Sequence, residues 1–134
     1  MPLVRIDLRA GQPDERVRAI GDAVHQALVE CLGVPARDRF QIVAEHRPDR
    51  LRYYPTYLDI ARTDDFTVIH VTLSAGRTTA QKQAFYSRLA ALLAAGPGLR
   101  PQDVAIVLVE NTREDWSFGD GEAQYLTLPR ERWR

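Results

Sequence analysis

Pro2, Asp38 and Arg77 combine reactive side-chain or amine chemistry with positions at the ends of predicted elements. Pro2 begins an alternating run of apolar and polar residues, and loss of Met1 would leave its secondary amine at the start of a strand. An α-amine has a reference pKa of about 7.7–8.0, so small changes in surroundings decide whether it acts as acid or base. A proline can also simply start an edge strand, where its missing N–H does no harm. The residues themselves leave both readings open.

Asp38 lies between a predicted helix end and a predicted strand, and Arg77 directly precedes Thr78 at the start of a helix. An aspartate at the position of Asp38 can simply stabilise a turn. An arginine at the position of Arg77 is most often a solvent-exposed side chain without a ligand. A guanidinium can instead hold a carboxylate with two hydrogen bonds, and helix N-terminal amides would add to an anion site. Arg77 and the start of the second predicted helix therefore allow a site for a small carboxylate.

The elements that would position these residues follow a strand–helix–strand order that occurs twice. Alternation or apolar runs predict strands at residues 2–9, 40–45, 67–74 and 104–110, and helical spacing predicts helices from Pro13 to Leu32 and from Thr78 to about Gly96. Asp38 matches Asp103 at a constant shift of 65 residues, as do the strands. We interpret this as a duplicated βαβ unit, in which both aspartates can serve a turn.

The pattern predicts the α/β (α+β) class: one domain over residues 1–134, with pseudo-repeats at about 2–46 and 67–111. The two units would form one four-stranded sheet with both helices on one face. Its other face would carry Phe40, Ile42, Val107 and Val109, so a partner subunit is expected to cover it. Residues 47–65 predict an irregular connection with a short strand at 58–61, residues 123–127 predict a further strand, and a frayed basic end is expected from Pro129.

Composition excludes several function classes. The 134 residues include 18 basic and 18 acidic side chains, so no overall charge favours nucleic acid or an anionic membrane. No apolar run reaches membrane-spanning length and no signal peptide opens the chain, which favours a cytoplasmic protein. Cys31 lies on an apolar helix stripe and is expected to be a buried thiol. His25 and His46 lack metal-ligand spacing, so neither metal nor cofactor is expected.

Several motifs are specific enough to carry a family resemblance: Met1-Pro2-Leu3, the segments 33–39 and 46–48, Arg77, Val109-Glu110-Asn111, and Asp115-Trp116-Ser117-Phe118-Gly119. Together with the duplicated unit they resemble the tautomerase superfamily, in the branch of malonate semialdehyde decarboxylase. The resemblance spans nearly the whole chain.

The resemblance implies a homotrimer in which Pro2, freed of Met1, is the catalytic group and a small carboxylate is the substrate. By the same resemblance Asp38 would orient a water or accept a proton, Arg77 would bind the carboxylate, and Trp116 and Phe118 would form an apolar wall. One departure stands out: Ala75 occupies the position of the first of two arginines typical of the decarboxylase. Fewer cations near the amine would raise the pKa of Pro2 toward the acid role.

Three functions follow from these residues. Decarboxylation or hydration of a 3-oxo acid such as malonate semialdehyde, for which a protonated Pro2 would stabilise an enolate, is the leading hypothesis. Keto–enol tautomerisation of a 2-oxo acid, with a neutral Pro2 as base, is the alternative that the missing arginine favours. A non-catalytic trimeric binding protein is the third, and retention of Met1 would support it because the nitrogen of Pro2 would then be an amide.

Overall fold

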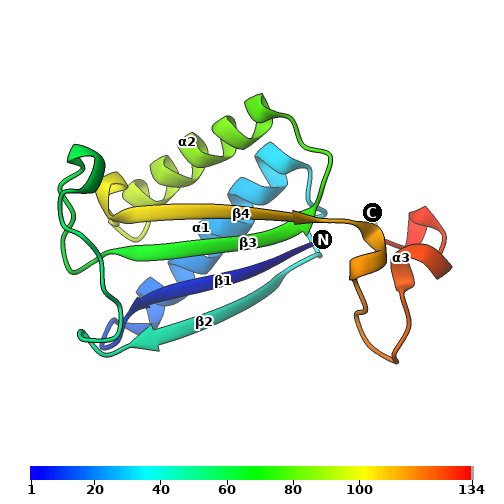
Figure 1. Cartoon of the computed structure of the whole chain (residues 1–134), viewed down its shortest axis with the longest axis horizontal. Helices are drawn as coiled ribbons and strands as arrows, with labels where there is room; N and C mark the ends of the chain where they lie inside the picture. Colours follow the sequence, from blue (N-terminus) through cyan, green and yellow to red (C-terminus); the bar gives the residue numbers. More distant parts are fainter. Residues whose placement is uncertain (134) are drawn as a thin grey trace.

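Four strands form a single mixed sheet in the order β2-β1-β3-β4, and two helices cover one of its faces (Figure 1). The computed structural model describes residues 1–133. The elements are β1 (Pro2–Arg9), α1 (Asp14–Leu32), β2 (Phe40–His46), β3 (Thr67–Ser74), α2 (Thr79–Ala95), β4 (Val104–Asn111) and the short α3 (Gln124–Thr127). Four 3-10 turns join them: η1 (Tyr57–Asp59), η2 (Pro101–Asp103), η3 (Arg113–Asp115) and η4 (Arg130–Arg132).

The sheet joins two equivalent halves. Within each half the strands run parallel, β1 beside β2 and β3 beside β4, while the central pair β1 and β3 is antiparallel. Pro2 pairs with Leu73 and Asp7 with Val68, so the start of β1 lies beside the end of β3. This register brings the N-terminus next to the segment that carries Arg77.

The core lies between the sheet and the helices. The inward side chains of β1 and β3 alternate with outward ones, and the helices contribute apolar stripes, as the sequence predicts. Buried members include Val4, Ile6, Ile69, Phe85 and Leu89, each at most 1% exposed. Burying one such large side chain contributes about 1.5–3 kcal/mol, so this layer holds the strand ends in place. Cys31 is only partly buried and packs at the edge of this core.

The helix ends follow local sequence signals. Gly33 ends α1 with a φ of 67°, a left-handed conformation that favours glycine. Thr78 and Gln81 form the predicted capping box at the start of α2. Both ends matter for the site because Asp38 follows Gly33 within one loop and Arg77 precedes Thr78.

The other face of the sheet is open and apolar in the isolated chain, as predicted. Phe40, Ile42, Val107 and Val109 are each 42–50% exposed there. Within residues 1–133, no helix combines the length and apolar character that a membrane crossing needs.

Three predictions for the irregular segments are wrong. The strand expected at 58–61 is replaced by η1, in which Leu58 adopts a φ of 59°. The strand expected at 123–127 is the helical turn α3, which pairs with no strand of the sheet. The end expected to fray from Pro129 instead forms η4 and packs back, with Trp133 edge-on to Tyr125 at 4.8 Å. An aromatic pair of this kind contributes about 0.5–1.5 kcal/mol beyond its buried area.

Candidate active site

The chain's own N-terminus faces a carboxylate. The amine nitrogen of Met1 lies 3.7 Å from Oδ2 of Asp38, and the two side chains are 7% and 15% exposed. The loop after α1 sets this position, because the backbone N–H of Asp38 donates to the carbonyl of Pro35. Pro2 itself is buried at the start of β1.

Burial changes the protonation of both groups. It lowers the pKa of the Met1 amine below its ordinary value, and Asp38 acts in the opposite direction while Arg77 adds to the lowering. Burial likewise raises the pKa of Asp38, and the nearby amine partly offsets that change. The raised pKa expected for a Pro2 amine stays a prediction, and the burial at this end of the sheet acts against it.

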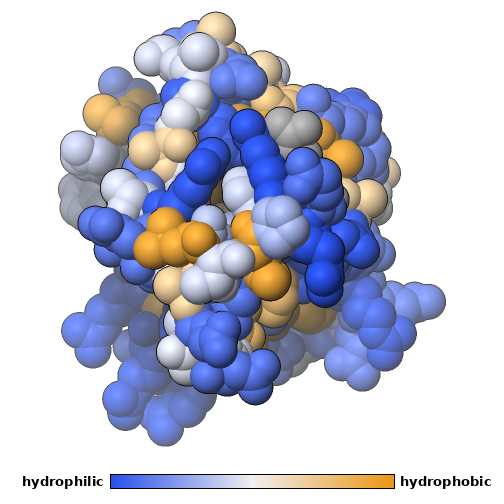
Figure 2. Space-filling model, turned by 90° about the vertical axis from the view of Figure 1, so that its right-hand side faces the viewer, coloured by the Kyte–Doolittle hydropathy of each residue, from blue (hydrophilic) through white to orange (hydrophobic). Residues whose placement is uncertain are grey.

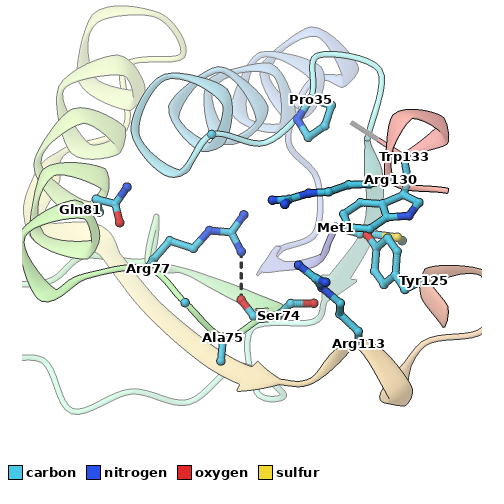
Figure 3. A pocket seen from close by; sticks show the side chains of 12 residues that line it. Met1, Pro35, Ser74, Ala75, Arg77, Gln81, Arg113, Tyr125, Arg130 and Trp133 are labelled. Carbon is cyan, nitrogen blue, oxygen red and sulfur yellow. Dashed lines mark hydrogen bonds between the residues drawn. The ribbon is translucent and has the colours of Figure 1, made fainter.

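Arg77 is held by the backbone. Its Nε donates to the carbonyl oxygen of Leu32 over 3.1 Å. Its Nη1 donates to the carbonyl oxygen of Ser74 over 2.9 Å (Figure 3). These two bonds fix the plane of the guanidinium and leave Nη2 unused among the described residues. The arrangement therefore presents N–H groups to the cavity at a fixed angle, as carboxylate binding requires.

Four aromatic side chains form a continuous row beside the N-terminus, which we call the aromatic wall: Trp116, Phe118, Tyr125 and Trp133. Trp116 stacks on Phe118 at 5.6 Å, and Phe118 meets Tyr125 edge-on at 4.9 Å. The indole N–H of Trp116 donates to Oδ1 of Asn111. Trp116 and Phe118 line a cavity that Met1 also borders, and their role as an apolar wall for a substrate stays a prediction.

Met1 lies at the junction of three cavities. One of about 440 Å³ contains Arg77, another of about 390 Å³ contains Asp38 and Phe118, and a third of about 490 Å³ contains Trp116 and Phe118. Figure 2 looks onto this end of the molecule, where blue hydrophilic side chains gather with a few orange hydrophobic ones among them. Since Met1 borders all three, its removal would expose the amine of Pro2 where the three cavities meet.

Comparisons with known proteins agree on the family. The tautomerase enzyme family matches residues 38–119, and a second tautomerase enzyme family matches residues 2–59. Probable tautomerase YusQ of Bacillus subtilis (strain 168) is 40% identical over 94% of this chain and 99% of its own length. Probable tautomerase YrdN of the same organism is 41% identical over 95% of this chain and 98% of its own length.

The chain belongs to the tautomerase family. It is similar in structure to FG41 malonate semialdehyde decarboxylase inhibited by 3-bromopropiolate, with 46% identity, a TM-score of 0.88, and coverage of 93% of this chain and 95% of that one. A second malonate semialdehyde decarboxylase is 39% identical with a TM-score of 0.88, covering 93% of this chain and 96% of that one. A fused 4-OT symmetric trimer, 21% identical with a TM-score of 0.75, shares the fold over 95% of this chain and 99% of its own. This tautomerase therefore lies structurally close to the decarboxylase branch, and the family makes it an enzyme of the decarboxylase, hydratase or isomerase type.

Four residues that line this site of the tautomerase were not predicted from its sequence: Arg113, Tyr125, Arg130 and Trp133. They come from η3, α3 and the segment from η4 to residue 133, and all four line the cavity that contains Arg77. The burial of Tyr125, together with the charge of Asp38, raises its pKa to about 12. Its hydroxyl therefore stays protonated at neutral pH and can donate a hydrogen bond. The only sequence signal that could have indicated these four residues was the presence of two aromatic side chains, Tyr125 and Trp133, near the arginines of the C-terminal segment.

Ala75, the departure from the decarboxylase pattern, lies beside one of these residues. Ala75 and Arg113 line the same two cavities, on either side of Ser74. Figure 3 shows the small side chain of Ala75 below Arg77, with Arg113 approaching from the segment that follows the neighbouring parallel strand β4. The space that the decarboxylase's first arginine would occupy, left open by Ala75, therefore lies next to Arg113 of the C-terminal segment.

The remaining candidates serve structure. Asp103, the repeat partner of Asp38, is fully buried and accepts hydrogen bonds from the backbone N–H and the hydroxyl of Thr63. His25 contacts the carbonyl of Ala36, and His46 contacts Asp7. Within residues 1–133, no three metal-ligating side chains gather at one point.

Proposed function

We propose that this tautomerase, once Met1 is removed, uses the secondary amine of Pro2 as an acid or base on a small oxo acid without a cofactor. The reaction proposed first is decarboxylation, or the related hydration, of a 3-oxo acid such as malonate semialdehyde. The observation that carries the proposal is the N-terminal amine 3.7 Å from Asp38, in a pocket shared with Arg77. Similarity to a malonate semialdehyde decarboxylase at 46% identity supports it.

In the proposed decarboxylation the substrate carboxylate binds the guanidinium of Arg77. A protonated Pro2 donates a hydrogen bond to the 3-oxo oxygen. The bond between the carboxylate carbon and the α-carbon then breaks, its electron pair passes to the α-carbon, and the enolate forms against the ammonium. CO2 leaves, and a proton returns to the α-carbon. Trp116 and Phe118 exclude water from the pocket, which strengthens the contact between the ammonium and the enolate oxygen.

Asp38 has two proposed duties. Its negative charge acts against the lowering of the pKa of the Met1 amine by burial, and after removal of Met1 it would favour the protonated form of Pro2 in the same way. In the hydration reaction the same carboxylate orients a water toward the substrate, because it lines a cavity that adjoins the one containing Arg77 at Met1.

Keto–enol tautomerisation of a 2-oxo acid is the second candidate. Burial lowers the pKa of the Met1 amine in this position, and a neutral amine is what a proton-abstracting base requires. The curated relatives are themselves called probable tautomerases. In this reaction Pro2 removes a proton from carbon and returns it to oxygen.

Intact mass measurement of the protein from its native host, followed by turnover of 3-oxo and 2-oxo acids, tests the proposal. Loss of Met1 and turnover of a 3-oxo acid that falls as pH rises through the pKa of Pro2 support decarboxylation. Activity that rises with pH through the same pKa on a 2-oxo acid supports tautomerisation. Retained Met1 with no turnover would indicate the non-catalytic binding protein. Arg77→Ala with unchanged turnover would remove Arg77 from the site.

We also propose that the chain forms a homotrimer through the open face of its sheet. Exposed Phe40, Ile42, Val107 and Val109 support an interface there. Sedimentation should give three times the chain mass, and Ile42→Lys should shift it to the monomer because a charge would enter the apolar contact. A wild-type monomer at micromolar concentration would contradict the interface.

A further inference from the structure

The cavity that contains Arg77 also receives two arginines from the C-terminal segment. We propose that Arg113 and Arg130 form a second carboxylate subsite, so that the substrate class of this tautomerase is an oxo acid with two carboxylates. The inference rests on the proposed function in one respect: it takes the cavity beside Pro2 as the substrate pocket.

The three guanidinium groups face one space. Figure 3 shows Arg77 pointing into the cavity from the start of α2, with Arg113 and Arg130 pointing toward it from the other side. All three line the cavity of about 440 Å³. A volume of this size falls within the usual range for small-ligand pockets and leaves room beyond a three-carbon acid.

The charges in this pocket are not balanced by protein groups. Among residues 1–133, no carboxylate lies within 4.0 Å of the guanidinium of Arg77, Arg113 or Arg130. Asp38 pairs with the N-terminal amine instead. One substrate carboxylate would neutralise Arg77 and leave the two arginines of the tail without a counter-charge. A second carboxylate on the same substrate supplies it.

Trp133 holds the two tail arginines in place. The guanidinium of Arg113 lies 5.2 Å from the centre of its indole ring, and that of Arg130 lies 5.9 Å from it. A guanidinium placed over an aromatic ring can still donate its N–H groups to a carboxylate. Because the side chains are already ordered, binding costs less conformational entropy than it would at free surface arginines.

The hydroxyl of Ser74 adds a second observation. Its Oγ is buried at the cavity wall and has no hydrogen-bond partner among the described residues. Buried hydroxyls normally have one. Ser74 is the neighbour of Ala75, so this unpartnered group stands between Arg77 and Arg113, on the path from the first carboxylate subsite to the second.

Calorimetric titration with succinate and butyrate, two four-carbon acids with two carboxylates and one, tests the inference without requiring turnover. Wild-type protein freed of Met1 should bind succinate at least about tenfold more tightly than butyrate, since one charge-assisted contact is worth that much. Arg113→Gln combined with Arg130→Gln should remove this preference and leave butyrate affinity unchanged. Arg77→Gln should weaken both acids.

Arg18→Gln is the matched control, because Arg18 is an exposed arginine of α1 outside the cavity. It removes one positive charge, the same change as Arg77→Gln, and should leave the preference intact. Equal wild-type affinity for the two acids overturns the proposal, whether or not the double variant folds. A preference that survives in a folded double variant also overturns it. If the preference holds and no oxo acid is turned over, the subsite stands and the proposed reaction fails.

Discussion

The two ends of the sheet are built alike and behave differently. The 65-residue shift places Thr67 at the position of Pro2, Asp103 at that of Asp38, and Gln12 at that of Arg77. Each aspartate follows a helix, precedes an outer strand and lies near the start of a central strand. The two neighbourhoods thus share one backbone plan.

At the end that contains Asp103, a loop that carries Thr63 leads directly into the start of β3. Thr63, four residues before Thr67, donates to both oxygens of Asp103 over 2.6 and 2.7 Å. Arg100 lies 3.8 Å away. A cavity at this end of the sheet, lined by Arg9, Tyr53 and Phe66 rather than by Asp103, measures about 20 Å³. Because protein groups already donate hydrogen bonds to both oxygens of Asp103, this carboxylate is not available to bind a substrate.

At the end that contains Asp38, the amine of Met1 lies beside the carboxylate, at the position where Thr63 donates at the other end. Cavities of several hundred cubic ångströms adjoin it. The difference teaches that the group facing the aspartate, an amine beside open cavities or a loop that fills both carboxylate oxygens, distinguishes the candidate site from its inert counterpart.

The largest expected effect comes from extending the chain before Pro2, at the end of the sheet that contains Asp38. A non-cleavable extension before Pro2 turns its nitrogen into an amide without basicity. We expect turnover of the substrate identified above to fall about 10⁴-fold, the upper range for loss of an acid–base group. The same extension with a protease site that leaves Pro2 first should recover activity after cleavage. Full activity in the uncleaved protein would remove Pro2 from the reaction.

Asp38→Asn should produce the next largest effect. It keeps the shape but removes the charge beside the amine, so kcat/KM should fall about 10²-fold. Thermal unfolding should show little loss of stability, because the buried carboxylate makes no hydrogen bond as favourable as those of Asp103. A variant that unfolds readily yet keeps its kcat/KM would assign Asp38 to the turn.

Asp103→Asn should give the opposite result. Its hydrogen bonds to Thr63 are buried and charge-assisted, so the free energy of unfolding should fall by about 1–3 kcal/mol. The kcat/KM of the folded fraction should match wild type. Chemical denaturation and steady-state kinetics measure the two quantities, and a selective loss of kcat/KM would contradict the comparison.

The smallest effect concerns pH and stability. Burial raises the folded-state pKa of Asp38 above its ordinary value of 3.8. The folded protein therefore holds this proton more tightly than the unfolded chain, and stability falls as pH rises from 3.8 through the folded-state pKa. Asp38→Asn should lack this decline, so its stability relative to wild type should increase over that window. Parallel curves of denaturation midpoint against pH would contradict the raised pKa.

The regular part of the fold could be predicted because its signals are local and repeated. Alternation in β1 and β3 and the signals at Gly33 and Thr78 fixed the strands and helix ends to within about a residue. The 65-residue shift then indicated how two units share one sheet. Pro2 and Asp38 could be paired only through family resemblance, since nothing in their spacing states that the loop after α1 returns to the start of β1.

The C-terminal segment was poorly predicted for a physical reason. Its stability comes from tertiary contacts, Phe118 with Tyr125 and Tyr125 with Trp133, and such contacts leave no periodic pattern. The basic residues from Pro129 onward suggested a frayed end, whereas the guanidinium of Arg130 lies over the indole ring of Trp133, 5.9 Å from its centre. A four-residue helix such as α3 is also too short to show helical spacing.

Both chain ends come together at one end of the molecule (Figure 1). A fusion partner joined before Met1, or beyond the segment that follows η4, is therefore placed close to the mouth of the pocket. Laboratory handling of this protein should therefore place affinity handles elsewhere: the exposed connection around Arg50, at the far end of the sheet, is the natural site for an inserted label. A terminal tag that is harmless in most small proteins would here compete directly with the substrate.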